Sequence, residues 1–385
     1  MNEPINIGIV AGEASGDMLG ADLIRHLRNH FPEARFTGLG GDAMLAEGFV
    51  SLFDMERLSV MGFVEPLKRL PELLRMRRAL VKHFLDEGAV LVVGIDSPDF
   101  NLGLELRLRQ RGVLTAHYVS PSVWAWRQGR IKTIARAVDR MVTLFPFESD
   151  FYRSHQVPVT FVGHPLADRI PLDIDSQSAR KELALEGSPL LAVMPGSRSS
   201  EVRYMGNLFL HVCERLHREN SRLRFVMPSA NELRHRELSE LLKNYPELPL
   251  TLVRGKSHQV MAASDAVLLT SGTTALEAML FKKPMVVAYR TGALSFWLLA
   301  RLVKTQHISL PNLIAGKALV PELIQDEANL DNLLAALHVM LYDRGKRDAL
   351  KAEFCELHKS LRLDAGAAAA AELAAMILQR RGGDG

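Results

Sequence analysis

The 385-residue sequence contains only two cysteines, Cys213 and Cys355, and neither lies in a CxxC motif or at the spacing of a cysteine–histidine metal site. This scarcity argues against a disulfide framework and a structural zinc site, and it is compatible with a reducing cytoplasm. Long apolar runs are missing too, because no uncharged stretch reaches the roughly 18 residues that a membrane-spanning helix needs. We therefore expect a protein that is soluble or that lies on a membrane surface.

An excess of one charge is also lacking, because 47 Lys and Arg oppose 44 Asp and Glu. A net charge of +3 gives no indication of a nucleic-acid partner. The pI near 8.8 still suits an anionic surface if the basic residues cluster. The first residues, MNEPINIGIVAGEASGD, lack the basic segment and the long apolar run of a signal peptide. Together these features favour a cytoplasmic location.

What the chain does have is a repeated rhythm of apolar run, small-residue turn and amphipathic helix, which predicts an α/β fold with parallel sheets. A proline-punctuated acidic segment at 170–175 divides it, so we predict two Rossmann-like domains facing across a cleft, 1–168 and 169–340. From about Asp331 the pattern is helical, and we expect 341–385 to pack back on the first domain. The predicted strands are 5–11, 35–39, 89–95, 114–119, 141–144, 160–163, 190–194, 222–227, 250–253, 266–269 and 286–288.

The stretch SDAVLLTSGTTALEAMLFKKPMVV, from Ser264 to Val287, reads as strand, tight turn, helix and strand. Backbone N–H groups at the start of such a helix bind phosphate well, which makes Ser271, Gly272, Thr273 and Thr274 candidates. Glu277, one turn further on, is placed to reach a ribose diol. The alternative is purely structural, because Thr274-x-x-Glu277 also fits a capping box.

Two further segments of the second half carry candidate ligand contacts. Arg198 lies in a Gly/Ser turn after a predicted strand, and a guanidinium binds diphosphate oxygens in a bidentate manner. Glu201 either holds Arg198 or caps the helix that follows. Asn312, in the loop SLPNLIAG, is a candidate ligand contact.

Three acidic residues of the first half are candidate catalytic groups. Glu13 and Asp17 lie in a Gly-rich turn after the first strand, where carboxylates suit sugar hydroxyls or catalysis better than a pyrophosphate. Asp96 directly follows the strand AVLVVGI, and ligands of open α/β sheets bind beyond such strand ends. It is the preferred general base, oriented by Asp99 or Asn101. The structural alternatives are a helix cap for Asp17 and a turn-forming role for Asp96.

Two of the three tryptophans share one loop after the strand at 114–119, close to several basic residues. Aromatic rings beside cations suit recognition of a sugar or an acyl chain, although a buried loop plug is the alternative. A histidine that follows a later strand is a weaker candidate for the same cleft. The predicted acceptor-side residues are Ser15, Asp99, Asn101, Ser120, Trp124, Trp126 and His164.

A basic amphipathic segment at 58–84 is the first candidate for membrane contact, because a helix with an apolar stripe and a Lys/Arg face binds lipid interfaces. The apolar, cation-flanked run at 293–304 is the second. An ordinary helix packed on a sheet is the alternative for 58–84. The predicted contact residues are Met61, Phe63, Val64, Lys68 and Arg69.

Six motifs occur together: GEASGD at 12–17, GIDSPDFN at 94–101, YVSPSVWAWR at 118–127, PGSR at 195–198, SGTTALE at 271–277 and SLPNL at 309–313. As a set they make the chain resemble the lipid-A-disaccharide synthase family, from the first strand to the C-terminal helix. The resemblance implies a GT-B glycosyltransferase that joins UDP-2,3-diacylglucosamine to 2,3-diacylglucosamine 1-phosphate (lipid X). The implied products are a β-1,6-linked disaccharide and UDP.

On this hypothesis the phosphates bind at 271–274, Glu277 holds the ribose, and Asp96 deprotonates the acceptor's 6-hydroxyl in an inverting reaction. No cofactor is implied. No DxD motif follows a strand of the nucleotide domain, so Arg198 and a helix N-terminus replace a metal ion as charge stabilisers. Acylated substrates imply peripheral binding to the cytoplasmic face of the inner membrane.

Several alternatives stay open at this stage. A UDP-sugar 2-epimerase shares the two-domain layout but leaves the basic face at 61–82 and the tryptophan loop unexplained. A non-catalytic nucleotide-sugar sensor needs no Asp96. The order of Glu13, Asp17 and Asp96 as base, orienting group and sugar ligand is unsettled, and so is the oligomeric state, although exchange of an extended C-terminal helix between subunits would give a homodimer.

Overall fold

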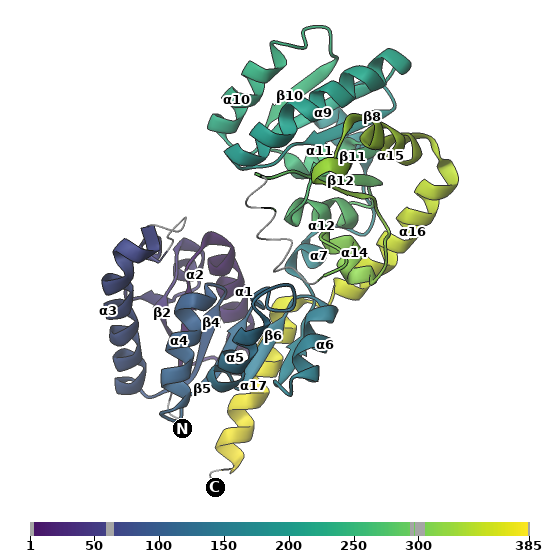
Figure 1. The fold of residues 1–385 in the computed structure, drawn as a ribbon. Helices are drawn as coiled ribbons and strands as arrows, with labels where there is room; N and C mark the ends of the chain where they lie inside the picture. The colour runs from purple at the N-terminus through teal and green to yellow at the C-terminus, as the bar shows by residue number, and fades with distance from the viewer. Residues whose placement is uncertain (1–3, 59–64, 293–295, 297–304, 384–385) are drawn as a thin grey trace. The chain divides into compact units, whose positions relative to one another are not determined.

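The computed structural model describes residues 4–58, 65–292, 296 and 305–383, without the side chains of 65–68. The chain forms two compact units (Figure 1). The first comprises Met1–Asp168 and Leu361–Gly385, and the second comprises Arg169–Ser360. Each is built around one parallel sheet, which confirms the predicted α/β class.

The first sheet has the strand order β3-β2-β1-β4-β5-β6-β7, with every neighbouring pair parallel. The chain winds one way from β1 to β3 and then returns to lay β4 against β1. Ligands of such sheets bind outside the carboxyl ends of the strands at this switch point. The strands are β1 (Asn6–Ala11), β2 (Arg35–Leu39), β3 (Val50–Ser51), β4 (Ala89–Ile95), β5 (Leu114–Tyr118), β6 (Arg140–Thr143) and β7 (Val159–Phe161).

Helices cover both faces of the first sheet, so its strands are apolar on both sides. One face packs against α1 (Ala14–His30), α2 (Asp42–Ala46) and α17 (Ala365–Gly383). The other packs against α3 (Glu65–Asp86) and α4 (Pro98–Arg109), and α5 (Ile131–Ala137) and α6 (Pro146–Ser154) continue that layer. A side chain at Gly366 of α17 would collide with Asp22, which shows how closely α17 approaches α1.

The second sheet has the order β10-β9-β8-β11-β12-β13, and its switch point lies between β8 and β11. Its strands are β8 (Leu190–Met194), β9 (Arg224–Ser229), β10 (Leu250–Arg254), β11 (Ala266–Thr270), β12 (Met285–Tyr289) and β13 (Glu322–Ile324). The helices of this unit are α8 (Ser176–Glu182), α9 (Ser199–Glu219), α10 (Glu232–Leu242), α11 (Ser257–Ala263), α12 (Thr273–Leu280), α14 (Leu310–Ala315), α15 (Leu330–Tyr342) and α16 (Arg344–Leu361). The short α7 (Pro165–Arg169) spans the boundary between the two units.

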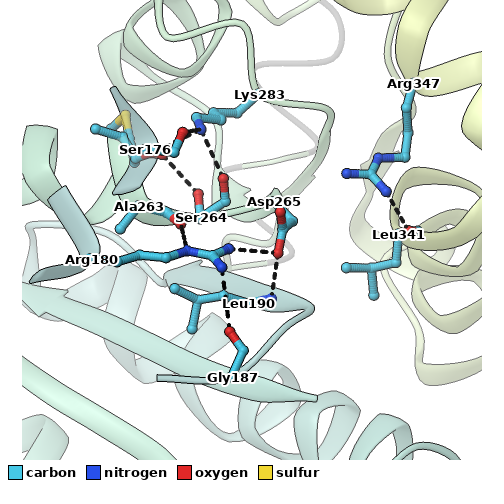
Figure 2. A network of polar contacts seen from close by, with 12 residues as sticks. Ser176, Arg180, Gly187, Leu190, Ala263, Ser264, Asp265, Lys283, Leu341 and Arg347 are labelled. Atoms are coloured by element: carbon cyan, nitrogen blue, oxygen red, sulfur yellow. Dashed lines mark hydrogen bonds and ion pairs between the residues drawn. The ribbon is translucent and has the colours of Figure 1, made fainter. Parts of the chain in front are cut away.

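A polar network ties α8 to the amino ends of β8 and β11 (Figure 2). Arg180 donates to Asp265 Oδ2 at 2.8 Å and to Ala263 O at 2.8 Å. Lys283 Nζ donates to Ser176 Oγ at 3.0 Å and to two main-chain carbonyls. Lys283 is buried, which lowers its pKa to about 8. The network lies at the strand starts, so the carboxyl ends of this sheet are left for ligand.

Most strands lie within two residues of their predicted positions, but two details differ. The edge strands β3 and β13 were not predicted. The helical C-terminal region is three helices, interrupted at Asp343 and at 362–364. The helix predicted over 58–84 is described only from Glu65, because 59–64 lie outside the described residues.

Candidate functional site

The strand register brings several predicted residues of the first unit to one edge of its sheet. Ala11 pairs with Ile95, and Ile95 pairs with Tyr118, so β1, β4 and β5 end level with one another. The turns that follow these strands carry Glu13, Asp96 and Ser120. Glu13 is exposed at the start of α1, beside the exposed Ser15.

Asp96 lies in a strained turn directly after β4. Its φ is 51° and that of Ser97 is 45°, so two successive residues with side chains adopt the left-handed conformation. Such conformations cost about 1–2 kcal/mol per residue, and they cluster at functional sites. Asp96 N–H donates to Tyr118 O at 2.9 Å, and Asn101 Nδ2 donates to Asp96 O at 2.8 Å. The Asp96 side chain is half-buried.

Asp17 has a structural use that the sequence did not show. It is 5% exposed, and its carboxylate accepts N–H bonds from Gly41 at 2.8 Å, Ala43 at 2.9 Å and Met44 at 3.2 Å. It therefore caps α2 rather than its own helix. With its oxygens occupied in this way, Asp17 is a poor candidate for the catalytic base.

Asp99 and Asn101, the two residues predicted to orient Asp96, lie in different environments. The Asp99 side chain is 83% exposed and forms an ion pair with Arg130. Asn101 is fully buried, and its amide faces the main chain of β1 and β4. Of the two, Asn101 is the one that hydrogen-bonds the main chain of Asp96.

The tryptophan loop contributes to a row of aromatic rings along the same edge. Trp124 packs edge-on against Phe147 at 4.8 Å between ring centres, and Phe147 stacks on Phe145 at 5.6 Å. Phe145 meets His164 at 5.2 Å. Each of these residues is half-buried, so part of its surface stays exposed. We call Trp124, Phe145, Phe147 and His164 the aromatic row.

Two features of this region escaped the sequence analysis. Phe145 and Phe147 were not predicted as site residues. The sequence Phe-Pro-Phe directly after a predicted strand was the signal that could have identified them. Glu148 is 5% exposed beneath the aromatic row, and burial raises its pKa to about 8. The N–H of Phe145 donates to its carboxylate at 3.2 Å, and Trp124 and Ser120 act against the effect of burial on that pKa.

Trp126 and Ser120 are not part of the row. Arg127 lies over the ring of Trp126 at 4.5 Å, a cation–π contact. Ser120 is 9% exposed and bonds to Tyr152 Oη at 2.9 Å and to Pro121 O at 2.9 Å. Ser120 therefore holds the loop in place from below.

The second unit contains a hollow of about 270 Å³ at the carboxyl ends of its strands. The turns after β8, β9 and β10 and the start of α12 form its walls. Thr274 and Glu277 of the predicted phosphate and ribose site line it, together with Gly196 and Ser197 beside Arg198. The hollow lies at the switch point between β8 and β11, where α/β sheets bind ligand.

The amino end of α12 is open towards this hollow. The helix begins at Thr273 with Gly272 as N-cap, and no side chain of the described residues caps it. The capping-box alternative therefore does not apply. Glu277 instead bonds to His258 Nε2 at 2.9 Å. Ser271 is half-buried, and Gly272 and Thr273 are exposed, so this turn is open to solvent.

Glu201 shapes the turn that carries Arg198. Its carboxylate accepts N–H bonds from Ser197 at 2.9 Å and from Arg198 at 3.0 Å, and it also pairs with the Arg198 guanidinium at 3.2 Å. Glu201 thus performs both predicted tasks, the cap and the brace. The Arg198 side chain is 80% exposed, so it is free to turn towards an anion.

The structure does not support the prediction that Asn312 contacts a ligand. It is 1% exposed, and its amide donates to Val320 O and to Glu322. Its oxygen accepts from the N–H groups of Leu319 and Val320 at 2.8 and 2.9 Å. All its hydrogen-bonding groups hold the 309–322 loop, so none is available to a ligand.

The predicted membrane segment is only partly described. Met61, Phe63 and Val64 lie outside the described residues, as does the side chain of Lys68, while Arg69 pairs with Glu72 at 3.2 Å. Further along α3, Arg75, Arg78 and Lys82 are exposed. No described helix is long and apolar enough to cross a membrane, and no group of three potential metal ligands occurs in the described part of the chain.

Comparison with known proteins gives a consistent result. A family model described as lipid-A-disaccharide synthetase matches residues 7–377. A lipid-A-disaccharide synthase of Hahella chejuensis is 53% identical over 380 residues, covering 98% of this chain and 96% of that protein. One of Pseudomonas aeruginosa is 51% identical over 382 residues, covering 99% and 100%.

Solved structures agree on the fold at much lower identity. The glycotransferase of kitacinnamycin superposes with a TM-score of 0.65 at 15% identity, covering 98% of this chain and 100% of that one. A UDP-GlcNAc 2-epimerase from Neisseria meningitidis, bound to UDP-GlcNAc, gives 0.61 at 13% identity with the same coverage. These likenesses confirm the predicted fold class, a GT-B fold with two Rossmann-like units.

Proposed function

The chain belongs to the lipid-A-disaccharide synthetase family, and on that basis we propose how its two strand-edge sites divide the transfer. The protein is a glycosyltransferase of lipid A disaccharide synthesis. The observation that carries this conclusion is the family match over residues 7–377, with relatives at about half identity over the whole chain. In the proposed reaction UDP-2,3-diacylglucosamine glycosylates the 6-hydroxyl of lipid X, with inversion, and UDP leaves.

We assign UDP to the hollow of the second unit. The uncapped start of α12 supports this, because its N–H groups and dipole attract the diphosphate. Glu277 is placed to accept hydrogen bonds from the ribose hydroxyls, and His258 holds it in position. Arg198 turns towards the leaving phosphate, where negative charge grows in the transition state.

The Glu277 assignment has a direct test. The substitution Glu277→Gln keeps the side-chain shape but weakens acceptance from a ribose diol, so we expect UDP affinity measured by calorimetry to fall about tenfold. The exposed Glu240, on α10, provides a matched control, and Glu240→Gln should leave the affinity unchanged. Equal affinities for the wild type and Glu277→Gln would remove Glu277 from the site.

We assign the acceptor to the carboxyl edge of the first sheet, with Asp96 as general base. The half-buried aromatic row supports contact with an acyl chain, because partly exposed aromatic residues offer apolar surface. Arg127 is exposed in the same loop and suits the acceptor's 1-phosphate. Glu13 and Ser15 are exposed at this edge and serve as sugar contacts.

The experiment that tests the function is a transfer assay in detergent with EDTA, using both substrates. We expect UDP release that depends on lipid X and yields a disaccharide. UDP release without acceptor would favour the epimerase, which shares this fold, and binding without release would favour a sensor. The variant Asp96→Asn should lose turnover while retaining UDP binding, and Asp150→Asn, at an exposed position of α6, should behave as wild type.

We also propose that the protein binds the cytoplasmic face of the inner membrane peripherally. The exposed cations of α3 support this, because basic residues attract anionic headgroups. Replacing Met61 and Phe63 together by alanine should reduce co-sedimentation with anionic vesicles. Leu233 is a matched control, because it is a 60% exposed leucine in the other unit; an equal loss with Leu233→Ala would contradict a localised contact.

Homodimerisation is a separate proposal. The close packing of α17 on α1 would be preserved if two copies exchanged this helix. Analytical ultracentrifugation of the full chain tests it, and a monomer at micromolar concentration would exclude a stable exchanged dimer.

A further inference from the structure

A polar cluster is buried behind the Asp96 turn, beside the apolar residues that pack α4 against the sheet. Asn101 and Glu105 lie one turn apart on α4, and His117 lies on β5; all three are 0% exposed. His117 Nδ1 and Glu105 Oε1 are 2.7 Å apart. Burying polar groups away from water is unfavourable unless they are hydrogen-bonded, so such a cluster calls for an explanation.

Asn101 connects this cluster to the ends of two strands. Its Nδ2 donates to Asp96 O at 2.8 Å and lies 3.3 Å from Ile95 O and 3.2 Å from Val10 O. One side-chain amide is therefore within hydrogen-bonding distance of main-chain carbonyls at the ends of both β1 and β4, at the switch point. Further support comes from the Asn101 N–H, which donates to Ser97 O at 3.0 Å. Both strained residues, Asp96 and Ser97, are thus bonded to Asn101.

Gly94 shows that Asn101 and Glu105 act on the same piece of backbone. A methyl group added at Gly94 would collide with Glu105 Oε1 and with Cβ and Cγ of Asn101. Both side chains therefore press on β4 two residues before Asp96, and the Gly94 backbone hydrogen-bonds Glu105. Asn101 and Glu105 can pack this closely against β4 because Gly94 has no side chain.

We propose that Asn101, Glu105 and His117 form a positioning unit that holds Asp96 in its left-handed turn. Asn101 fixes the Asp96 carbonyl, and the Glu105–His117 pair fixes Asn101's helix against β4 and β5. Within the described chain, Asn101 Oδ1, Glu105 Oε2 and His117 Nε2 have no protein partner. These three atoms suit ordered water that completes the network. The inference rests on the proposed role of Asp96 as base.

Burial raises the pKa of the Glu105 carboxyl, and the interaction with His117 acts against this effect. The contact between the two side chains therefore offsets part of the cost of burying the carboxyl.

The test compares kcat, KM and the pH profile in the full-length enzyme. Asn101→Leu keeps the shape but loses the amide, and a base displaced by about 1 Å loses roughly a hundredfold in rate. We expect a 10- to 100-fold lower kcat, an altered acidic limb of the kcat–pH profile, and UDP affinity within twofold of wild type. Glu105→Leu should behave similarly, whereas Glu105→Gln should recover most of the loss because it preserves a hydrogen-bonding side chain of the same shape.

Leu104→Ala is the matched control, because Leu104 is equally buried on α4 but lies in the apolar layer. This variant should lower Tm without changing kcat or the acidic limb of the kcat–pH profile. A folded Asn101→Leu variant with wild-type kcat and pH profile would overturn the proposal, as would an equal kcat loss in Leu104→Ala. If Asp96→Asn itself remained active, the assignment of the base would fail first, which separates the two hypotheses.

Discussion

The buried Glu148 beneath the aromatic row should make the stability of the first unit depend on pH. The residue is 5% exposed, and the pKa of its carboxyl is raised from an ordinary 4.5 to about 8, mainly by burial. The substitution Glu148→Gln replaces the acid by a neutral group of the same shape. The glutamine oxygen retains an acceptor for the Phe145 N–H.

The sign and size of the effect follow from proton linkage. Between pH 4.5 and 8 the folded chain holds a proton that the unfolded chain has released, so stability falls as pH rises through this range. Each pKa unit corresponds to about 1.4 kcal/mol, which makes the full effect about 5 kcal/mol. Glutamine does not titrate. We therefore expect Glu148→Gln to match the wild type near pH 5 and to exceed it by several kcal/mol at pH 9.

Denaturant unfolding at a series of pH values, followed by tryptophan fluorescence, to which Trp124 and Trp126 of the first unit contribute, measures this difference. The exposed Asp150 on the same helix is the control, and Asp150→Asn should show the wild-type pH dependence. A constant difference between wild type and Glu148→Gln across pH 5–9 would refute the reasoning. So would a glutamine variant that is less stable at pH 9.

Three other perturbations have defined outcomes. Asn312→Ala leaves several buried loop groups without partners and should cost about 3 kcal/mol in unfolding free energy, with UDP affinity by calorimetry unchanged. For Lys283 the folded pKa is lowered from 10.5 to about 8, so stability should rise by about 3 kcal/mol between pH 8 and 10.5 in denaturant titrations, and Lys283→Met should abolish that rise. Gly196→Ala should lower UDP affinity at least tenfold, because φ is 116° there and a methyl group would strike Glu201; wild-type affinity would contradict the proposed turn geometry.

The sequence allowed most of the fold to be predicted because the central strands are buried on both faces and therefore appear as continuous apolar runs. The segments AVLVVGI and LLAVM are such runs, and β4 and β8 have the predicted bounds. The edge strands β3 and β13 have two and three residues, and none of these is buried. So short a segment lacks a periodic pattern, and its pairing depends on a neighbour that is distant in sequence.

Site residues were predictable where they directly follow a strand, because the fold itself brings strand ends together. The roles of Asp17 and Asn312 were not, because their partners are backbone N–H groups that only the folded chain supplies. Glu105 and His117 were missed for a related reason. Each lies in an apolar context, and a polar residue in the middle of the buried strand LTAHY was the only available signal.

The switch point of the first sheet fixes a side chain, whereas that of the second exposes backbone N–H groups. This difference fits the proposed division of the reaction. In the first unit, residues with side chains occupy the left-handed turn after β4, and the buried side-chain amide of Asn101 holds the Asp96 carbonyl. That arrangement fixes one side chain, as a general base requires. In the second unit, Gly196 and Gly272 form the turns after β8 and β11, and the amino end of α12 has no side-chain cap in the described structure. That arrangement exposes backbone N–H groups, as a diphosphate leaving group requires. An Asn101 variant should therefore lower kcat and leave UDP affinity unchanged. A Gly196 variant should mainly lower UDP affinity.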